Sequence, residues 1–321
     1  MKIAVIGGGR NDEHLVSLAS AAGIAHAARQ VGWETVALTI DEDGTWRDRQ
    51  GAELSPSRAV GQLTQCDVVF PALHGVHGED GAVAGLLELC GVPFVGSPVR
   101  AGAIGMDKWL TKLVATAVGI RTAEGVVVPP GTSSPVVRLP LPVVVKPATG
   151  GSSNGVSVVG QRAELSTAIA DARRAGATVL VEEYVRGREV DVAVFRDATG
   201  QLRLGSTLEI GVEAGGVFGR AAKYDGTARF TLPADLSASE HHAIRESAAA
   251  MYDAMECSGV ARFDFFVTDT GLVLNEVNTS PGMTEQSQVP RMFAAVGMAY
   301  PQLIAELVAA ARVPEPIGIT A

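Results

Sequence analysis

The sequence has little cysteine and no long hydrophobic run. Its three cysteines, Cys66, Cys90 and Cys257, are scattered through 321 residues. An odd, scattered set does not suit a disulfide framework, so we expect buried thiols in a reducing cytoplasm. No apolar stretch approaches the length of a transmembrane helix, and we expect no membrane partner. We also expect no signal peptide, because the chain enters an apolar strand directly after Met1.

Clustered positive charge is absent as well. The net charge is −9 and no block of Lys or Arg occurs, which disfavours nucleic acid as a partner. It does not exclude an anionic nucleotide, which needs only a few local cations. A length of 321 residues with 47% hydrophobic residues suits two or three packed α/β units.

Two common nucleotide-binding signatures are missing or incomplete. No G-x-x-x-x-G-K-[ST] occurs, which disfavours P-loop NTPases. Gly7 and Gly9 follow an apolar strand at residues 2–6 and could begin G-x-G-x-x-G, but Asp12 stands at the third position. A dinucleotide-dependent oxidoreductase is therefore a rival hypothesis with one supporting feature, Asp41 after the second strand.

The chain does contain an unusual hairpin at residues 260–282. Arg262 and Asp264 are two apart on its first strand, as are Glu276 and Asn278 at the end of its second, so each pair shares a face. Two carboxylates and an amide oxygen suit Mg²⁺. The structural alternative is a half-buried hairpin with a solvated salt-bridge face. The strands are expected at residues 261–268 and 272–277, with a turn at 269–271.

This hairpin resembles the second signature of the D-alanine–D-alanine ligases, a family of the ATP-grasp superfamily. The resemblance implies that Asp264, Glu276 and Asn278 hold the catalytic Mg²⁺, as two ions that Mn²⁺ can replace. It also implies that Arg262 and the backbone N–H of Gly282 stabilise the oxyanion of a tetrahedral intermediate, a role in which preorganised donors contribute strongly.

A second stretch, residues 73–85, matches the first signature of that family, H-G-x-x-G-E-D-G. Its histidines and acidic residues also invite a zinc site, but no zinc-type paired spacing occurs. By resemblance, His74 and Glu79 lie in the amino-acid site at the carboxyl end of a parallel strand, and His77 is solvated. The family also implies that Glu13 binds the ammonium of the first amino acid. Its alternative role is a carboxylate favoured at a helix N-terminus.

Residues 143–159 are expected to form strand, small-residue loop and strand. Such a flap can close its backbone N–H groups over phosphates, although a plain flexible hairpin is the alternative. The run E-E-Y-V at residues 182–185 resembles the adenosine pocket of ATP-grasp enzymes. In that family Glu182 accepts from the adenine amino group and Glu189 binds the ribose. The ATP contacts implied by the resemblance are Lys108, Lys146, Ser153, Glu182, Glu183, Val185, Glu189 and Lys223.

Further family features complete the implied site. Ser152 is implied to link Glu13 to Tyr224, which lies in the A-K-Y of a glycine-rich loop at residues 211–226. Residues 218–221 of that loop depart from the family's usual Y-D-Y-E. Ser287 and Gln288 are implied to bind the carboxylate of the second amino acid, although an apolar residue is common where Gln288 stands.

We therefore predict an α/β protein with a three-domain ATP-grasp architecture. The expected domains are a Rossmann-like N-terminal domain with a parallel sheet at residues 1–97, and two α+β domains at 98–187 and 188–321 that sandwich ATP. Helices are expected at residues 15–31, 106–118, 162–175, 237–257 and 289–311. Further strands are expected at residues 35–40, 67–71, 92–95, 178–181, 190–195 and 202–210.

The implied activity is that of an ATP-dependent carboxylate–amine ligase. One amino acid is activated as an acyl phosphate, and the amine of a second displaces phosphate. D-alanine is the expected substrate at both sites. The alternatives are a related dipeptide ligase that uses other amino acids in specialised metabolism, and a nucleotide-binding regulator without activity. We expect a cytoplasmic homodimer that acts in peptidoglycan synthesis.

Overall fold

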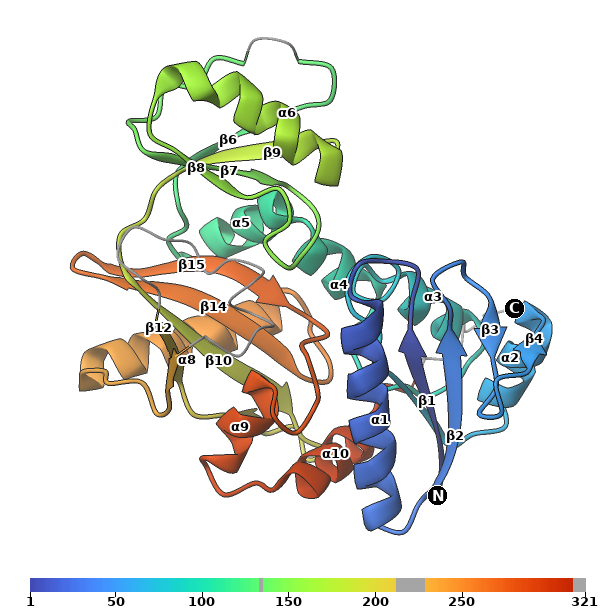
Figure 1. Cartoon of the computed structure of the whole chain (residues 1–321). Coiled ribbons are helices and arrows are strands. Elements are labelled where there is room, and N and C mark those ends of the chain that lie inside the picture. Colours follow the sequence, from blue (N-terminus) through green and yellow to red (C-terminus); the bar gives the residue numbers. More distant parts are fainter. Residues whose placement is uncertain (133–134, 212–228, 314–321) are drawn as a thin grey trace, which may run out of the picture.

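The computed structural model describes residues 1–132, 135–211 and 229–313, and these build three separate sheets (Figure 1). The first sheet has the order β4-β3-β2-β1-β5, in which β1, β2 and β5 run parallel. Its strands are β1 (Lys2–Gly8), β2 (Glu34–Ile40), β3 (Trp46–Arg47), β4 (Glu53–Leu54) and β5 (Val68–Pro71). Its helices are α1 (His14–Gln30), α2 (Pro56–Leu63) and α3 (Ala82–Leu89).

Both faces of this parallel sheet are covered. Successive residues of β1 point to opposite sides, so Ile3 and Val5 join the core beneath α1, whereas Ala4 and Ile6 join the core beneath α2 and α3. The apolar run of β1 fits this double burial. The loops that follow β1 and β5 lie at the carboxyl edge of the sheet, which is where such sheets bind ligands.

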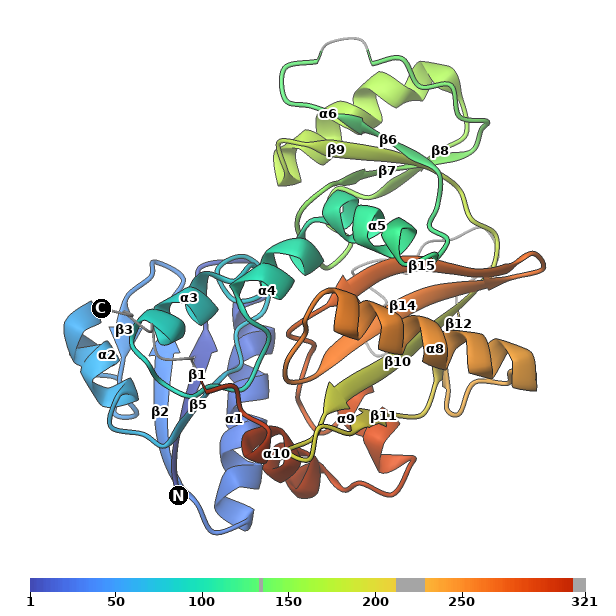
Figure 2. The same ribbon diagram turned by 180° about the vertical axis from the view of Figure 1, so that it is seen from behind.

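The second sheet is antiparallel, with the order β6-β9-β7-β8. Helix α6 covers one of its faces, and valines of β7 and β9 pack beneath this helix. The other face is turned toward the third sheet, and α5 lies between these two sheets (Figure 2). The elements are β6 (Gly125–Val128), β7 (Val143–Pro147), β8 (Ser157–Val159), β9 (Val179–Glu183), a 3₁₀ turn at Arg162–Glu164 and α6 (Leu165–Ala175).

The third sheet has the order β13-β12-β10-β14-β15, with β11 paired to β10. Helices α4, α5 and α8 cover one end and face of it, and α9 and α10 join its core to that of the first sheet. Its strands are β10 (Arg188–Arg196), β11 (Leu202–Leu204), β12 (Leu208–Gly211), β13 (Arg229–Thr231), β14 (Ala261–Thr268) and β15 (Gly271–Asn278). The helices are α4 (Val99–Met106), α5 (Lys108–Ala117), α8 (Ala238–Ala254), α9 (Gln288–Ala294) and α10 (Tyr300–Ala309).

Several predicted elements differ from the structure. In place of the strand expected at residues 92–95, Phe94 forms isolated bridges with Val69 and with Arg312. The helix expected at 106–118 begins one residue after Asp107, whose carboxylate caps α5, and a separate helix α4 precedes it. The strand expected at 202–210 is divided into β11 and β12, and the helix at 289–311 into α9 and α10. Helices α2, α3 and α4 and strands β3, β4, β6 and β13 were not predicted from the sequence.

The predicted division at residues 1–97, 98–187 and 188–321 stays a prediction. The first, second and third sheets fall within these three ranges. Helices α4 and α5, however, contribute Ala101 and Ala115 to the core of the third sheet. Across the described ranges, no helix is long and apolar enough to cross a membrane.

Candidate active site

The predicted hairpin brings its four polar residues to one face. Arg262 pairs with Asn278 across the strands, and Asp264 pairs with Glu276. A register shift after Asp264 makes this possible, because the next pair is Phe265 with Leu274 and the intervening residue of β15 is bulged. The expectation that these side chains share one face is thus confirmed.

Arg262 donates hydrogen bonds from all three nitrogens of its guanidinium. Its Nε and Nη2 donate to the two carboxylate oxygens of Asp264, each at 2.7 Å, in a bidentate pair. Its Nη1 donates to Oε1 of Gln288 at 2.8 Å, and Asp191 lies 3.6 Å from Nε. Burial disfavours the charged guanidinium, but Asp264 and Asp191 outweigh it and hold the pKa of Arg262 well above its ordinary value. The guanidinium is therefore charged and fixed in orientation.

The carboxylate and amide oxygens of the hairpin suit a divalent cation as ligands. The Nδ2 of Asn278 donates to Asp264 at 3.1 Å, which leaves the amide oxygen as the group for a cation. Among the described residues there is no cluster of three or more His, Cys, Asp or Glu that could hold a metal alone. A set of two carboxylates and one amide oxygen matches Mg²⁺, which takes its other ligands from water and substrate phosphates.

His74 and Glu79, which follow β5, line the same hollow as the four hairpin residues. The Nδ1 of His74 lies 2.8 Å from the carbonyl oxygen of Ser280, so it carries the proton, and Nε2 accepts from Ser20 at 2.9 Å. Burial lowers the pKa of His74, which keeps the ring neutral. Burial, reinforced by the charge of Glu13, raises the pKa of Glu79 to about 8.

Glu13 reaches the hollow from the loop before α1. Ser152 donates a short hydrogen bond to its carboxylate across 139 residues of sequence. Ser152 has a φ of 53° and Ser153 a φ of 55°, left-handed conformations that are strained for residues with a Cβ. Gly75 lies beside this carboxylate and has a φ of 67°, a left-handed conformation that favours glycine.

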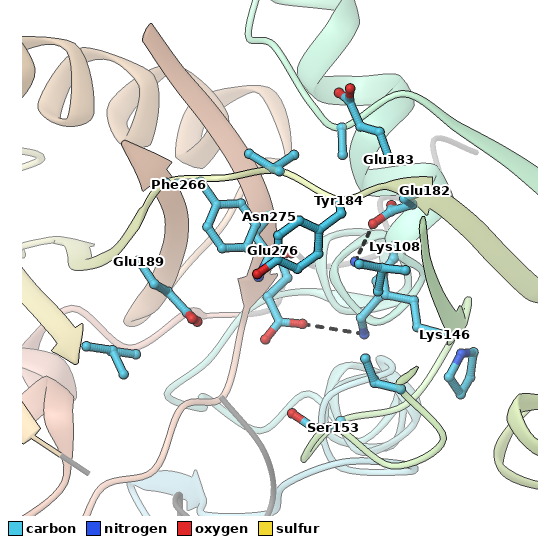
Figure 3. Close-up of a pocket in the computed structure, with 18 of the residues that line it drawn as sticks. Lys108, Lys146, Ser153, Glu182, Glu183, Tyr184, Glu189, Phe266, Asn275 and Glu276 are labelled. Atoms are coloured by element: carbon cyan, nitrogen blue, oxygen red, sulfur yellow. Dashed lines mark ion pairs between the residues drawn. The ribbon is translucent and has the colours of Figure 1, made fainter. Parts of the chain in front are cut away.

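A second hollow lies between the second and third sheets (Figure 3). Glu182 of β9 is buried there, with Lys112 2.8 Å from one oxygen and Lys146 2.7 Å from the other. The Nζ of Lys108 donates to the carbonyl of Gly150 at 2.7 Å and lies 3.5 Å from Glu276. Cations from α5 and β7 thus meet carboxylates from β9 and β15 in one space.

The predicted site residues fall into these two hollows. We call the one between the second and third sheets the flap cavity, and the one beside Arg262 and Asp264 the hairpin cavity. Their volumes are about 290 and 610 Å³, together enough for a nucleotide with small partners. The flap cavity is lined by the predicted residues Lys108, Lys146, Ser153, Glu182, Glu183, Val185, Glu189 and Glu276. The hairpin cavity is lined by Glu13, His74, Glu79, Lys108, Ser152, Glu189, Arg262, Asp264, Glu276, Asn278, Gly282, Ser287 and Gln288.

The two cavities adjoin, since Lys108, Glu189 and Glu276 line both of them. Two predicted residues, Lys223 and Tyr224, and the altered stretch at 218–221 lie outside the described residues. His77 is exposed, as expected.

Sequence reasoning missed two charged residues of the site. Asp191 lines the hairpin cavity and pairs across the ladder with Asp264. The sequence indicated Asp191 by its position two residues after Glu189 on β10, because residues two apart on a strand point to the same face. Lys112 pairs with Glu182 from behind the flap cavity, and its signal was its position one helical turn after Lys108.

Comparison with known families gives matches over most of the chain. The family described as "D-ala D-ala ligase N-terminus" matches residues 2–97, and "D-ala D-ala ligase C-terminus" matches residues 132–309. A D-alanine–D-alanine ligase of Mycobacterium avium is 41% identical over 354 aligned positions, covering 96% of this chain and 95% of the relative. One of Rhodococcus opacus is 40% identical, with the same coverage of each chain. Both alignments exceed the 321 residues of this chain, so these relatives contain residues that it lacks.

Solved structures with the same fold carry related titles. The VanG D-Ala:D-Ser ligase of Enterococcus faecalis superposes with a TM-score of 0.82 at 30% identity, covering 96% of this chain and 98% of that chain. The D-alanine–D-alanine ligase of Coxiella burnetii gives 0.82 at 30% identity, covering 97% and 93%. That of Bacillus anthracis, solved in complex with ATP, gives 0.81 at 27% identity, covering 97% of each.

Proposed function

The chain belongs to the D-alanine–D-alanine ligase family, and from that premise we propose how its residues share the reaction. It is an ATP-dependent ligase with the ATP-grasp fold, and it joins two D-alanine molecules through an acyl phosphate, releasing ADP and phosphate. The roles of individual residues, the metal and the assembly are our proposals.

One observation carries the assignment of roles, namely that the flap and hairpin cavities share a wall. Lys108 and Glu276 line both, with 3.5 Å between Nζ and a carboxylate oxygen. Nucleotide in the flap cavity and amino acids in the hairpin cavity would therefore meet at this wall. Phosphoryl transfer depends mainly on such positioning and on neutralisation of charge.

In the first step, the carboxylate of one D-alanine attacks the γ-phosphate. Glu13, fixed by Ser152, holds the ammonium of this substrate, since a buried ammonium needs an anionic partner. Lys108 and Lys146 neutralise phosphate charge at the wall and floor of the flap cavity. Lys223 is proposed to contact the γ-phosphate, and Tyr224 to extend the link from Glu13.

In the second step, the neutral amine of the other D-alanine attacks the acyl carbon. Arg262 and the N–H of Gly282 stabilise the oxyanion that develops. The fixed charge of Arg262 supports this role, because its donors need no reorientation. Ser287 and Gln288 bind the carboxylate of this second substrate. His74 and Glu79 supply neutral groups to the lining of the amino-acid site.

The base and sugar of ATP are proposed to occupy the inner part of the flap cavity. Glu182 accepts from the adenine amino group, and the backbones of Glu183 and Val185 contact the base edge. Glu189 binds the ribose hydroxyls, and Ser153 binds the γ-phosphate. The buried position of Glu182 at the floor of this cavity supports the base contact.

Asp264, Glu276 and Asn278 would hold Mg²⁺, which supplies charge neutralisation for the phosphates when bound. We propose two such ions, which Mn²⁺ could replace, with their other ligands supplied by water and phosphate. Beyond the site, we propose a cytoplasmic homodimer with no nucleic-acid partner, consistent with the net charge of −9. The three-domain division at residues 1–97, 98–187 and 188–321 is proposed on the three sheets.

A substrate panel tests the substrate assignment. Purified protein with ATP and Mg²⁺ is incubated with D- and L-amino acids, singly and in pairs, and phosphate release is measured together with dipeptide mass. D-alanine alone should give D-alanyl-D-alanine. If only a mixed or L-pair gives product, ligase chemistry stands but the pair of D-alanines does not, and the related dipeptide ligase becomes the better account.

A further inference from the structure

Lys112 is a buried cation that none of the roles above uses. It lies on α5, one turn after Lys108, is 4% exposed and does not line the flap cavity. Its Nζ lies 2.8 Å from Oε1 of Glu182 and donates to the carbonyl of Ala123, also at 2.8 Å. Burial lowers the pKa of Lys112, while the charge of Glu182 opposes that effect. Burying a charged lysine costs desolvation free energy unless its ion-pair and hydrogen-bond partners compensate for that cost.

The two cations on Glu182 differ in their access to the flap cavity. Lys146 contacts the other carboxylate oxygen at 2.7 Å and also lines the flap cavity. A phosphate bound there would compete with Glu182 for Lys146. Lys112, behind the wall, has no such competitor in the cavity, so it remains the constant partner of the carboxylate.

Lys112 also fixes the strand opposite Glu182. The carbonyl it holds belongs to Ala123, which lines the flap cavity and lies two residues before Gly125, the ladder partner of Glu182. The intervening Glu124 donates its N–H to the carboxylate of Glu183 at 3.0 Å. One ammonium therefore sets both the carboxylate and the backbone that faces it.

We propose that Lys112 is a positioning residue that holds Glu182 as an ionised hydrogen-bond acceptor and thereby selects 6-amino purines over 6-oxo purines. This rests on the proposed function, in which Glu182 accepts from the amino group of the base. An ionised carboxylate only accepts, so the oxygen of a 6-oxo purine finds no donor there. A protonated carboxyl donates one hydrogen bond and would accept a 6-oxo purine more readily. Without Lys112 the buried carboxyl would more often be protonated.

The test is nucleotide binding by the full chain with Lys112→Met. Affinities for ATP and for inosine triphosphate are measured by calorimetry. ATP affinity should fall about tenfold or more, and the ratio of ATP to inosine triphosphate affinity should fall about tenfold, on the scale of one hydrogen bond to a charged group. Lys2→Met is the matched control, because Lys2 opens β1 and lines neither cavity. It should change neither the ATP affinity nor the ratio.

A double-mutant cycle separates positioning from packing. In a Glu182→Gln background, Lys112→Met should lower ATP affinity less than about threefold, because the carboxylate that Lys112 positions is gone. Lys112→Arg should keep the preference for ATP. If Lys112→Met lowers the melting temperature too far for titration, Lys112→Gln and Lys112→Arg carry the same comparison.

Two results would overturn the proposal. One is an unchanged ATP to inosine triphosphate ratio in the Lys112 variants that lack the charge. The other is an equal loss of affinity whether Lys112 is replaced in the unmodified chain or in the Glu182→Gln background, which indicates packing alone. Ligation of D-alanine by the unmodified protein is measured in parallel, and its absence would count against the proposed function instead.

Discussion

The two adjoining cavities bury glutamates in opposite ways. In the flap cavity burial acts to raise the pKa of Glu182, but Lys146 and Lys112 outweigh it and the pKa is lowered. In the hairpin cavity burial and the neighbouring Glu13 raise the pKa of Glu79 to about 8. The first carboxylate has its counter-charges built in, whereas the second lies beside another carboxylate.

This difference indicates how each cavity is completed. The flap cavity is electrostatically organised before its ligand arrives, which lowers the cost of binding. The hairpin cavity gathers carboxylates, including Glu13, Asp191 and Asp264, around one fixed guanidinium. It would be completed by the ammonium group of the first substrate and by a divalent cation. Variants should therefore change nucleotide affinity in one cavity and substrate use in the other.

The largest effect is expected where the cavities meet. Glu276→Gln removes a charge that both cavities share, so turnover should fall at least roughly a hundredfold, on the scale of losing one strong electrostatic contact. Phosphate release in the presence of D-alanine measures it. Glu246→Gln, at a position on α8 away from both cavities, is the control for a changed charge and should be near normal. Near-normal turnover of Glu276→Gln would show that the hairpin is not part of the active site.

Lys146→Ala should affect the flap cavity alone. Its loss removes one cation from the phosphate site but leaves Glu182 paired with Lys112, so the fold should survive. ATP affinity should fall about ten- to hundredfold, the range for a hydrogen bond between charged groups. Calorimetry gives this value, and the KM for D-alanine is expected to stay within a few-fold. An unchanged nucleotide affinity would mean that the flap cavity does not hold the phosphates.

Glu13→Gln should affect the hairpin cavity alone. The amide keeps the hydrogen bond with Ser152 but loses the charge that pairs with an ammonium. The KM for D-alanine at the first site should rise about tenfold, with ATP affinity retained. Steady-state kinetics at saturating ATP measure the change. A rise in the KM for ATP of the same size would show that the two cavities do not divide the substrates as proposed.

The smallest effect is on stability and its dependence on pH. The folded protein keeps the proton of Glu79 up to about pH 8, whereas the unfolded chain loses it near the ordinary value of 4.5. Stability should therefore fall as pH rises through this window, because the native state binds more protons. Glu79→Gln should flatten this pH profile. Compared with the unmodified protein, its free energy of unfolding should improve by at least about 1 kcal/mol more at pH 8 than at pH 5. Urea unfolding at both values tests it, and parallel profiles would contradict the raised pKa.

Much of the site could be predicted from sequence, because its residues stand in short motifs at the ends of strands. His74 and Glu79 after β5, and the flap between β7 and β8, are fixed by local chain geometry. The nucleotide and hairpin residues then meet because three sheets pack around one space. That packing depends on contacts between distant segments, such as Ser152 with Glu13, which no local pattern specifies.

The bulge in β15 marks the limit of the local argument. Near the turn the register pairs Thr268 with Gly271 and Phe265 with Leu274. Continued without interruption, it would pair Asp264 with Asn275 and turn Glu276 to the opposite face. The prediction of one shared face was therefore correct only because an extra residue shifts the register. A two-residue periodicity cannot reveal that shift.

The central claim is that the carboxylate of one D-alanine attacks ATP at the wall shared by the two cavities. It is tested most directly with D-alanine labelled with ¹⁸O in its carboxylate. An acyl phosphate leaves its bridging oxygen on phosphate when the amine attacks, so the account predicts that one ¹⁸O appears in the released phosphate for each dipeptide formed. Mass spectrometry of the phosphate reads this out. Dipeptide formed with unlabelled phosphate would contradict the account.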